Sequence, residues 1–431
     1  MLALGPDGPL TGVPPIVVRG QSLRAAKQFV AGTHRCMSPE ETFERIRPHF
    51  RRAGITRLAD VTGLDRVGVT TVTAVRPNGR TLSSSAGKGF TRMAALVSAA
   101  MESLEVHHAE YPTHPYTIAT LEELRATSPV IAEQHIPLSR YSLFKPDRPD
   151  TWVRGWDLLQ ECETYLPYAC AMLVRAPQQR PSNEMSMPIT SNGLAGGNHI
   201  LEAMCAALYE VIERDAVTCH THAEIIGGER PPMVDLAALE WPLVRELLGK
   251  FDAAGLRVVV RDCTTDTEVP VYAATLFDER TRGFGVFAGW GAHLDPEIAL
   301  IRALTEAAQS RVIYISGSRD DTFRLDERQV RYEDSAKEVG RLTTPGRASA
   351  PHRTSDAGAS FEEDLATLLA KVRHAGARQV LFVDLTLDEF QIPVARIVVP
   401  GFEGFVGHDY VHGERALAHI ARARLRETTR Q

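Results

Sequence analysis

The stretch SNGLAGGNHILE, residues 191–202, joins a loop of small residues to a predicted helix that continues through Glu210 to Arg214. This helix carries three carboxylates, Glu202, Glu210 and Glu213, among residues that are otherwise mostly small or apolar. A surface helix has an apolar stripe and a charged face, whereas this one is apolar nearly all round. We therefore expect its carboxylates to be buried, where each needs a partner such as a cation.

The composition is that of a soluble globular protein with a sizeable core. Of 431 residues, 44% are hydrophobic and 24% are charged, and the net charge is −6. This acidic balance gives no electrostatic footprint for nucleic acid or for an anionic membrane. No apolar run approaches the roughly 20 residues that cross a bilayer, and the N-terminus lacks a signal-peptide pattern. We expect a cytoplasmic protein whose 6 cysteines are reduced.

The order of predicted elements indicates a mixed α/β fold in which antiparallel-rich sheet packs against helices. A capping sequence, Ser38–Glu41, starts a helix that runs to about Arg52, and a β-branched strand follows at residues 67–75. Residues 112–150 are expected to be irregular. The later expected elements are paired strands at 152–159 and 164–174, a helix at 236–251, strands at 256–261, 269–277 and 284–288, a helix at 361–374, strands at 380–385 and 393–399, and a basic terminal helix. We expect an extension over residues 1–37 and one catalytic domain over 38–431, with 316–360 as a mobile insertion or lid.

One pattern occurs in three loop–helix units. In each unit an alanine precedes a glutamate by about two helical turns, and a second glutamate or a glutamine follows three residues later. The three sets are Ala95, Glu102 and Glu105; Ala203, Glu210 and Glu213; and Ala299, Glu306 and Gln309. Residues at i and i+3 are neighbours, so each helix offers two oxygen-bearing side chains side by side. Coincidence in Ala/Glu-rich helices is the alternative, but the glycines that begin all three units favour a shared site.

The chemistry that fits converging glutamates is phosphoryl transfer from a magnesium nucleotide. Several glutamates in one site repel one another unless cations lie between them, and Mg²⁺ prefers hard oxygen ligands. Small-residue turns such as the one at Ser191 and Asn192 offer backbone N–H groups to phosphate oxygens. Lys88 and Arg214 can neutralise the charge that is transferred. The sequence around Lys88 is not a Walker loop, because the GxxxxGK[ST] spacing is missing.

These motifs resemble those of the YcaO superfamily over roughly residues 38–405. The matching motifs are Ser98-x-x-x-Glu102-x-x-Glu105, then Asn198-x-x-x-Glu202-x7-Glu210-x-x-Glu213-Arg214, and finally Gly291–Pro296 with Glu306-x-x-Gln309-x-Arg311. By position, the resemblance implies that ATP is held by Ser98, Asn198, Glu202, Arg214, Glu306 and Gln309. It implies that magnesium is held by Glu102, Glu105, Glu202, Glu210 and Glu213.

The resemblance implies ATP-dependent activation of a peptide backbone amide. In that family a nucleophile attacks the amide carbonyl, the amide oxygen is phosphorylated, and phosphate leaves. A neighbouring Cys, Ser or Thr gives an azoline, an external sulfur donor gives a thioamide, and an amine gives an amidine. The sequence ends without the proline-rich PxPxP tail typical of azoline-forming members, and Val106 stands where many relatives have arginine. We therefore expect the non-azoline branch, which is often paired with a TfuA-like partner in thioamide formation.

Two alternatives to thioamide formation stay open. The first is an azoline-forming cyclodehydratase. The second is a non-catalytic accessory protein that binds nucleotide and docks a modification enzyme, because such a protein would keep the same glutamates. The expected partners are a precursor peptide or protein and a sulfur-delivering protein, with a homodimer as an option and with neither nucleic acid nor membrane.

Other polar residues near these motifs have competing interpretations. His293 precedes the third helix and either orients substrate and transfers protons or simply caps its loop. Cys219, His220 and His222 are interpreted as ordinary helix-end residues, because they lie too close along one helix to chelate one zinc ion easily. Glu403 can line the site, but nothing in its local sequence demands it.

Overall fold

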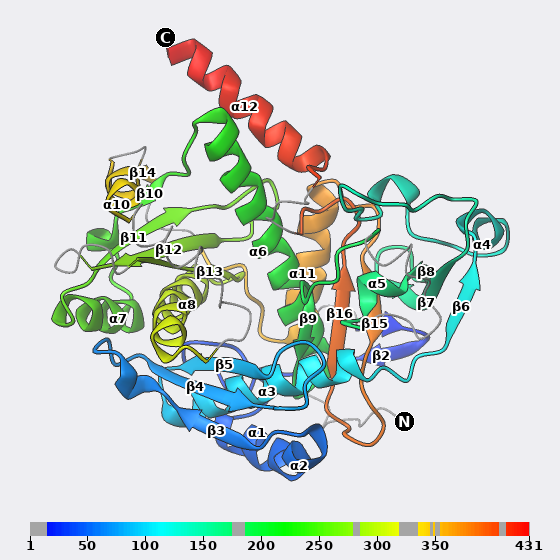
Figure 1. Ribbon diagram of the computed structural model, residues 1–431, viewed down its shortest axis with the longest axis horizontal. Coiled ribbons are helices and arrows are strands. Elements are labelled where there is room, and N and C mark those ends of the chain that lie inside the picture. The colour runs from blue at the N-terminus through cyan, green and yellow to red at the C-terminus, as the bar shows by residue number, and fades with distance from the viewer. Residues whose placement is uncertain are drawn as a thin grey trace. The chain divides into compact units, whose positions relative to one another are not determined.

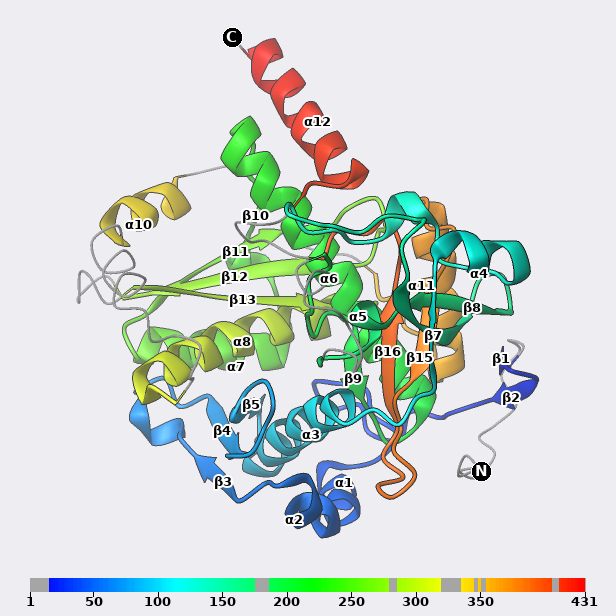
Figure 2. The ribbon, with the colours of Figure 1, turned by 45° about the vertical axis from the view of Figure 1, so that its right-hand side comes forward.

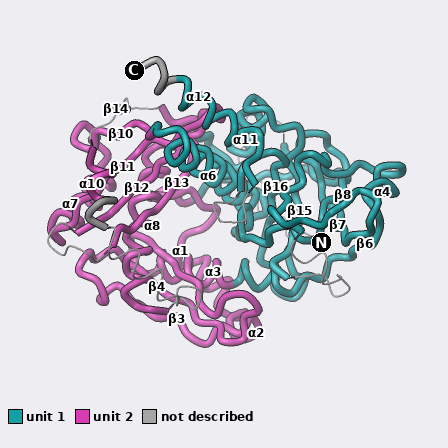
Figure 3. The backbone as a smooth tube through the Cα atoms, turned by 45° about the horizontal axis from the view of Figure 1, so that its top comes forward, with its two compact units in different colours: residues 1–28, 104–229, 357–431 teal, residues 29–103, 230–356 magenta. Residues whose placement is uncertain are grey.

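The computed structural model describes residues 15–174, 186–278, 285–318, 335–344, 348–349, 354–404 and 411–430. The chain forms two compact units, and each unit is built from stretches that are separated in the sequence (Figure 3). Unit 1 comprises residues 1–28, 104–229 and 357–431, and unit 2 comprises residues 29–103 and 230–356. Each unit combines helices with largely antiparallel sheet, which confirms the expected mixed α/β class.

Unit 1 contains a six-stranded antiparallel sheet in the order β6-β7-β15-β16-β9, with β8 paired to β7. Its strands are β6 (Tyr116–Ala119), β7 (Asp150–Asp157), β8 (Cys162–Pro167), β9 (Leu194–Gly196), β15 (Leu381–Asp384) and β16 (Val394–Val398), and a separate hairpin is made by β1 (Ile16–Val18) and β2 (Gln21–Leu23). Its helices are α4 (Leu121–Thr127), α5 (Tyr168–Ala171), α6 (Ile200–Gly227), α11 (Phe361–His374) and α12 (Glu414–Arg430), with the end of α3 (Arg92–Glu110).

Helix α6 contacts both strands and helices of unit 1. It packs against β9 and β16, and helices α11 and α12 pack against it in turn (Figure 1). Nearly every side chain from Ile200 to Tyr209 is buried, because the helix has neighbours on several sides. Strand β16 is also buried at four consecutive positions, Val394–Ile397, so both of its faces are covered. Helix α6 is apolar nearly all round because other elements of unit 1 pack against several of its sides.

Unit 2 contains two sheets. A three-stranded antiparallel sheet has the order β3-β4-β5, and a five-stranded sheet has the order β13-β12-β11-β10-β14, in which only β10 and β14 are parallel. The strands are β3 (Arg57–Asp60), β4 (Thr70–Val75), β5 (Ser84–Gly89), β10 (Met233–Val234), β11 (Arg257–Asp262), β12 (Val271–Phe277), β13 (Val286–Ala292) and β14 (Ala348–Ser349). The helices are α1 (Pro39–Ile46), α2 (Phe50–Ala53), α7 (Pro242–Ala253), α8 (Pro296–Ser316), α10 (Ser335–Thr343) and the start of α3. Helices α7 and α8 lie together on the β11–β13 sheet (Figure 2).

Local sequence signals fix several helix ends. Ser38 and Glu41 form the expected capping box at the start of α1. The single helix expected to reach Arg52 is instead interrupted by a 3-10 turn at Arg47–His49, because Pro48 cannot donate a helical hydrogen bond. The helix resumes as α2, and α2 ends at Gly54, which has a left-handed φ of 80°.

Several expected bounds are wrong, among them the start of the helix expected at 236–251, because α7 begins only at Pro242. Residues 112–150, expected to be irregular, contain β6 and α4. The strand expected to run to Val174 ends at Pro167, and α5 follows it directly. Strand β13 continues through Gly289–Gly291, which looked like a loop, because a glycine-rich strand can lie directly on a helix. Most of the insertion expected at 316–360 lies outside the described residues.

Among the residues that the structure describes, no helix is both long enough and apolar enough to cross a membrane.

Candidate functional site

Helix α6 carries the carboxylates that the sequence singles out. Its first turn is capped by His199, whose Nδ1 accepts a hydrogen bond from the Leu201 amide at 3.2 Å. Glu202 and Glu213 are buried, with 3% and 2% of their surfaces exposed, which confirms the expectation of buried acids on this helix. Glu210 is only half-buried, and its Oε1 lies 4.0 Å from Nε of Arg214 on the next turn.

Helix α3 presents its two glutamates differently. Glu102 is exposed, whereas Glu105 is half-buried. The Oε1 atom of Glu105 accepts a hydrogen bond from the backbone N–H of Gly196 at 2.8 Å. Since Gly196 ends β9, this bond ties α3 to the strand that leads into α6. Ser98, which stands about one helical turn before Glu102 on α3, is half-buried.

The turn before β9 carries two residues expected to bind ATP. Ser191 is exposed, whereas Asn192 is half-buried. The Oδ1 atom of Asn192 is buried and has no hydrogen-bond partner in the described part of the chain. Asn198, also half-buried, stands just before the cap of α6. A buried oxygen without a hydrogen-bond partner, such as Asn192 Oδ1, can accept a hydrogen bond from a ligand or coordinate a cation.

The residues of α6 fit a magnesium nucleotide by their chemistry. Mg²⁺ takes hard oxygen ligands, and the carboxylates of Glu202, Glu210 and Glu213 stand on this one helix. From Glu202 to Glu213 the row runs about 16 Å, and the two side chains return to within about 20° of one helix face. A row of this length suits several phosphate oxygens and more than one ion. A Cβ added to Gly197 would lie 2.9 Å from the Ala203 amide nitrogen, so the chain passes close to the start of the helix, where N–H groups attract phosphate.

In unit 2, strand β5 and helix α8 hold the remaining expected residues together. Nζ of Lys88 donates to Oε2 of Glu306 at 2.6 Å, and both side chains are about one-fifth exposed. The other oxygen of Glu306 accepts the Trp290 amide N–H at 3.3 Å. Nε2 of Gln309 donates to the carbonyl oxygen of Ala86 at 2.6 Å. The lysine expected to neutralise phosphate thus forms an ion pair with a carboxylate of α8.

The small residues of the repeat have a packing role. A Cβ added to Gly87 in β5 would lie 2.3 Å from the carbonyl oxygen of Ala95 in α3. A Cβ added to Gly291 in β13 would lie 2.1 Å from the carbonyl oxygen of Ala299 in α8, at the same sequence offset. Each strand therefore lies directly on the backbone of the helix that follows it, which only glycine and alanine allow. This packing accounts for the glycines and alanines, but it does not require the glutamates.

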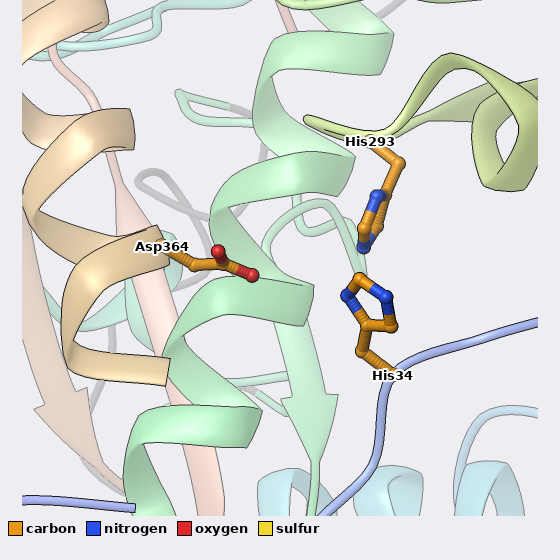
Figure 4. A group of neighbouring side chains, drawn as sticks. All are labelled: His34, His293 and Asp364. Carbon is orange, nitrogen blue, oxygen red and sulfur yellow. The ribbon is translucent and has the colours of Figure 1, made fainter. Parts of the chain in front are cut away.

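His293 holds the turn between β13 and α8. Its Nδ1 accepts the Asp295 amide N–H at 2.9 Å, which places the proton of the neutral ring on Nε2. The ring is buried and faces that of His34, with centroids 5.1 Å apart (Figure 4). The contact with Asp295 supports the loop-capping interpretation of His293, and its role in proton transfer stays a prediction.

The helix-end residues of α6 pair with α12. Nδ1 of His222 and Nε2 of His412 are 2.9 Å apart, and the rings of His220 and His419 lie 5.4 Å apart. These contacts support the interpretation of both α6 histidines as structural. Burial, followed by the nearby charge of His412, lowers the pKa of His222.

Sequence reasoning missed the network that joins α12 to the middle of α6. Asp215 is fully buried and accepts a two-pronged pair of bonds from Arg415, the closest at 2.8 Å. Glu403 is buried too, and its carboxylate accepts the N–H groups of Gly413 and Ala416 at the start of α12. Burial is the main cause that raises the pKa of Glu403. The signal was present in Asp215, the fourth carboxylate along α6, but its partner Arg415 lies 200 positions away.

Strand β16 holds a second missed residue, Arg396. It is the one charged side chain in the apolar run Val394–Val398, and that contrast was the available signal. Its guanidinium is buried beside the turn that carries Asn192.

Comparisons with known proteins identify the relatives of this chain. The family model described as YcaO cyclodehydratase, ATP- and Mg²⁺-binding, matches residues 86–403. An uncharacterized protein in the tfuA 3′ region of Rhizobium leguminosarum bv. trifolii is 32% identical over 411 residues, which covers 92% of this chain and 96% of that relative. The description of the family confirms ATP and Mg²⁺, the cofactors expected from the sequence.

Two solved structures are similar to this fold. The structure of YcaO from Methanopyrus kandleri bound with AMPPCP and Mg²⁺ has a TM-score of 0.71 and 25% identity, and the match covers 90% of this chain and 100% of that one. A heterocyclase in complex with substrate and cofactor has a TM-score of 0.76 and 23% identity, covering 88% of this chain and 54% of that one. At that identity the second similarity shows the fold alone.

Proposed function

Because this chain belongs to the YcaO family, we propose that it uses ATP and Mg²⁺ to activate a backbone amide of a ribosomally made peptide or protein, with a thioamide as the product. The observation that carries the proposal is the row of carboxylates on α6, in which Glu202 and Glu213 are buried inside an apolar helix. Burying a carboxylate in the protein interior costs free energy. The presence of two buried carboxylates on α6 therefore favours a role for this helix in binding cations.

The residues of unit 1 divide the work of binding. Glu202, Glu210 and Glu213 provide oxygen ligands for Mg²⁺, and Arg214 balances the charge of Glu210 from the next helical turn. Glu105 supports this site indirectly, because its bond to Gly196 fixes the strand that leads into α6. When bound, Mg-ATP supplies the phosphoryl group that lets the amide oxygen leave as phosphate.

The residues of unit 2 provide positive charge and orientation. Lys88 lies against Glu306, and we propose that it turns to the transferred phosphoryl group, where its charge stabilises the transition state. Gln309 is fixed by its bond to Ala86, which orients its carboxamide for a polar contact with the nucleotide.

Thioamide formation is favoured by the genetic setting of a relative. The protein that is 32% identical over 92% of this chain is described as lying in the tfuA 3′ region. In the family, a TfuA-like partner accompanies thioamide formation, so we propose a partner of this kind that delivers sulfur. Azoline formation is the second candidate, because the matching family model is described as a cyclodehydratase.

The test follows phosphate release and peptide mass in the same reaction. Purified protein is incubated with Mg-ATP, a candidate precursor peptide and sulfide, with and without a TfuA-like protein. Exchange of one oxygen for sulfur, with phosphate released in equal amount, is the expected result, whereas loss of one water from the peptide would assign azoline formation instead. If no peptide and partner stimulate phosphate release, the enzymatic function is wrong and the accessory role remains. The Glu210→Gln variant is the control, because it should stay folded and release no phosphate.

A further inference from the structure

Strand β16 carries a buried arginine in the unit that contains α6. Arg396 is 3% exposed, and its guanidinium donates to two backbone carbonyl oxygens, from Nε to Cys170 at 2.9 Å and from Nη2 to Thr190 at 2.7 Å. The third nitrogen, Nη1, is buried and has no hydrogen-bond partner among the residues that the structure describes. A buried charge with an unfilled donor costs stability, and such costs concentrate at functional sites.

The arginine holds the turn that carries Asn192. Its Nη2 bond to Thr190 fixes one end of the turn, and the amide N–H of Ile397 donates to the carbonyl oxygen of Gly193 at 2.8 Å and fixes the other. Gly193 has a φ of 76°, and a Cβ there would lie 2.1 Å from the carbonyl oxygen of Ile397. The turn is thus held to β16 at two places, at Thr190 by Arg396 and at Gly193 by Ile397.

Arg396 stands on β16, the strand on which helix α6 packs. Burial lowers the pKa of Arg396 to about 10, while the acidic groups of Cys170 and Glu210 act in the opposite direction. The guanidinium therefore stays protonated at neutral pH.

We propose that Arg396 is a positioning residue of the nucleotide site. It holds the Thr190–Gly193 turn, with Asn192, in a fixed place beside α6. It acts through this turn and does not itself touch the reacting atoms. This inference rests on the proposed function, because it assigns a role to Arg396 within the same Mg-ATP site.

The test compares three variants by their affinity for Mg-ATP and by the Mg²⁺ concentration that half-maximal binding needs. Arg396→Met removes the charge and the fork of donors, and Arg396→Lys keeps the charge. Arg261→Met is the matched control, because Arg261 is also a buried strand arginine that donates to two backbone carbonyls, those of Pro231 at 2.8 Å and Leu342 at 3.1 Å. Arg261 lies in unit 2 and is not part of the proposed site.

The expected result separates positioning from general stability. Arg396→Met should bind Mg-ATP about tenfold more weakly and need more Mg²⁺, and Arg396→Lys should recover most of that loss. Arg261→Met should lower the unfolding midpoint and leave both binding quantities as in the wild type. Wild-type affinity in Arg396→Met, or equal losses in Arg396→Met and Arg261→Met, would overturn the inference and leave the proposed function standing. If the wild type itself binds no Mg-ATP, the proposed function fails first, and the inference fails with it.

Discussion

Helix α6 of unit 1 and helix α8 of unit 2 follow the same plan. Each packs on the strand that precedes it, β9 or β13, and each ends at a glycine in the left-handed conformation, Gly228 or Gly317. Near the start of each, a histidine Nδ1 accepts a backbone N–H, that of Leu201 in one case and of Asp295 in the other. The shared plan shows that one packing solution serves both units.

The two helices differ in how they hold their charges. The carboxylate of α8, Glu306, is about one-fifth exposed and forms a close ion pair with Lys88. Helix α6 instead keeps Glu202 and Glu213 in its buried face, with exposures of 3% and 2%. The two helices therefore pack on their strands in the same way but differ in their charged side chains. Packing determines which positions are buried, and the charges at those positions determine what each helix can bind.

The largest predicted effect breaks the shared packing. Gly291→Ala should destabilise the protein by about 3 kcal/mol, because the added methyl group would overlap the backbone of α8. Denaturant unfolding measures this loss. The matched control is Gly249→Ala in α7, where a Cβ meets nothing within 4 Å. That control should stabilise the helix by about 0.5–1 kcal/mol, because alanine has the higher helix propensity. Equal unfolding midpoints for both variants would contradict the close approach of β13 to α8.

The sequence predicts elements whose signals are local. The capping box at Ser38, the bounds of α11 and the Asp295 cap of α8 all follow from residues within a few positions of one another. It fails where the cause is a distant contact. Strand β13 looks like a loop until α8 is seen to lie on its glycines. The role of Arg396 cannot be predicted from its neighbours in the sequence, because its hydrogen-bond partner Thr190 lies 206 positions away.

The second prediction sharpens the difference in charge. Glu213→Gln should weaken Mg-ATP binding about 100-fold, because it replaces an anionic oxygen ligand by a neutral carboxamide of the same shape. Titration calorimetry with a non-hydrolysable ATP analogue and Mg²⁺ measures the affinity, and the unfolding midpoint shows whether the fold is kept. An affinity equal to that of the wild type would remove Glu213 from the site and weaken the case for α6 as the binding helix.

A smaller effect is expected from the ion pair of α8. Lys88→Met should weaken Mg-ATP binding about tenfold, close to the loss of one charge-assisted hydrogen bond. The double variant Lys88→Met/Glu306→Gln tests whether the two side chains act together. Since each neutralises the other, the double variant should lose less than the sum of the two single losses. Strictly additive losses would mean that the contact between Lys88 and Glu306 has no part in binding.

The smallest effect concerns the far end of α6, where His222 meets His412, two residues before α12. Burial, then the charge of His412, lowers the pKa of His222 below its ordinary value of 6.5. The unfolded chain therefore binds the proton more readily than the folded chain, so stability is full above that value and is lost as the pH falls through it. Thermal unfolding between about pH 7.5 and about pH 5 should show a falling midpoint in the wild type and a shallower fall in His222→Gln. Equal slopes would show that this pair does not couple proton uptake to the docking of α12.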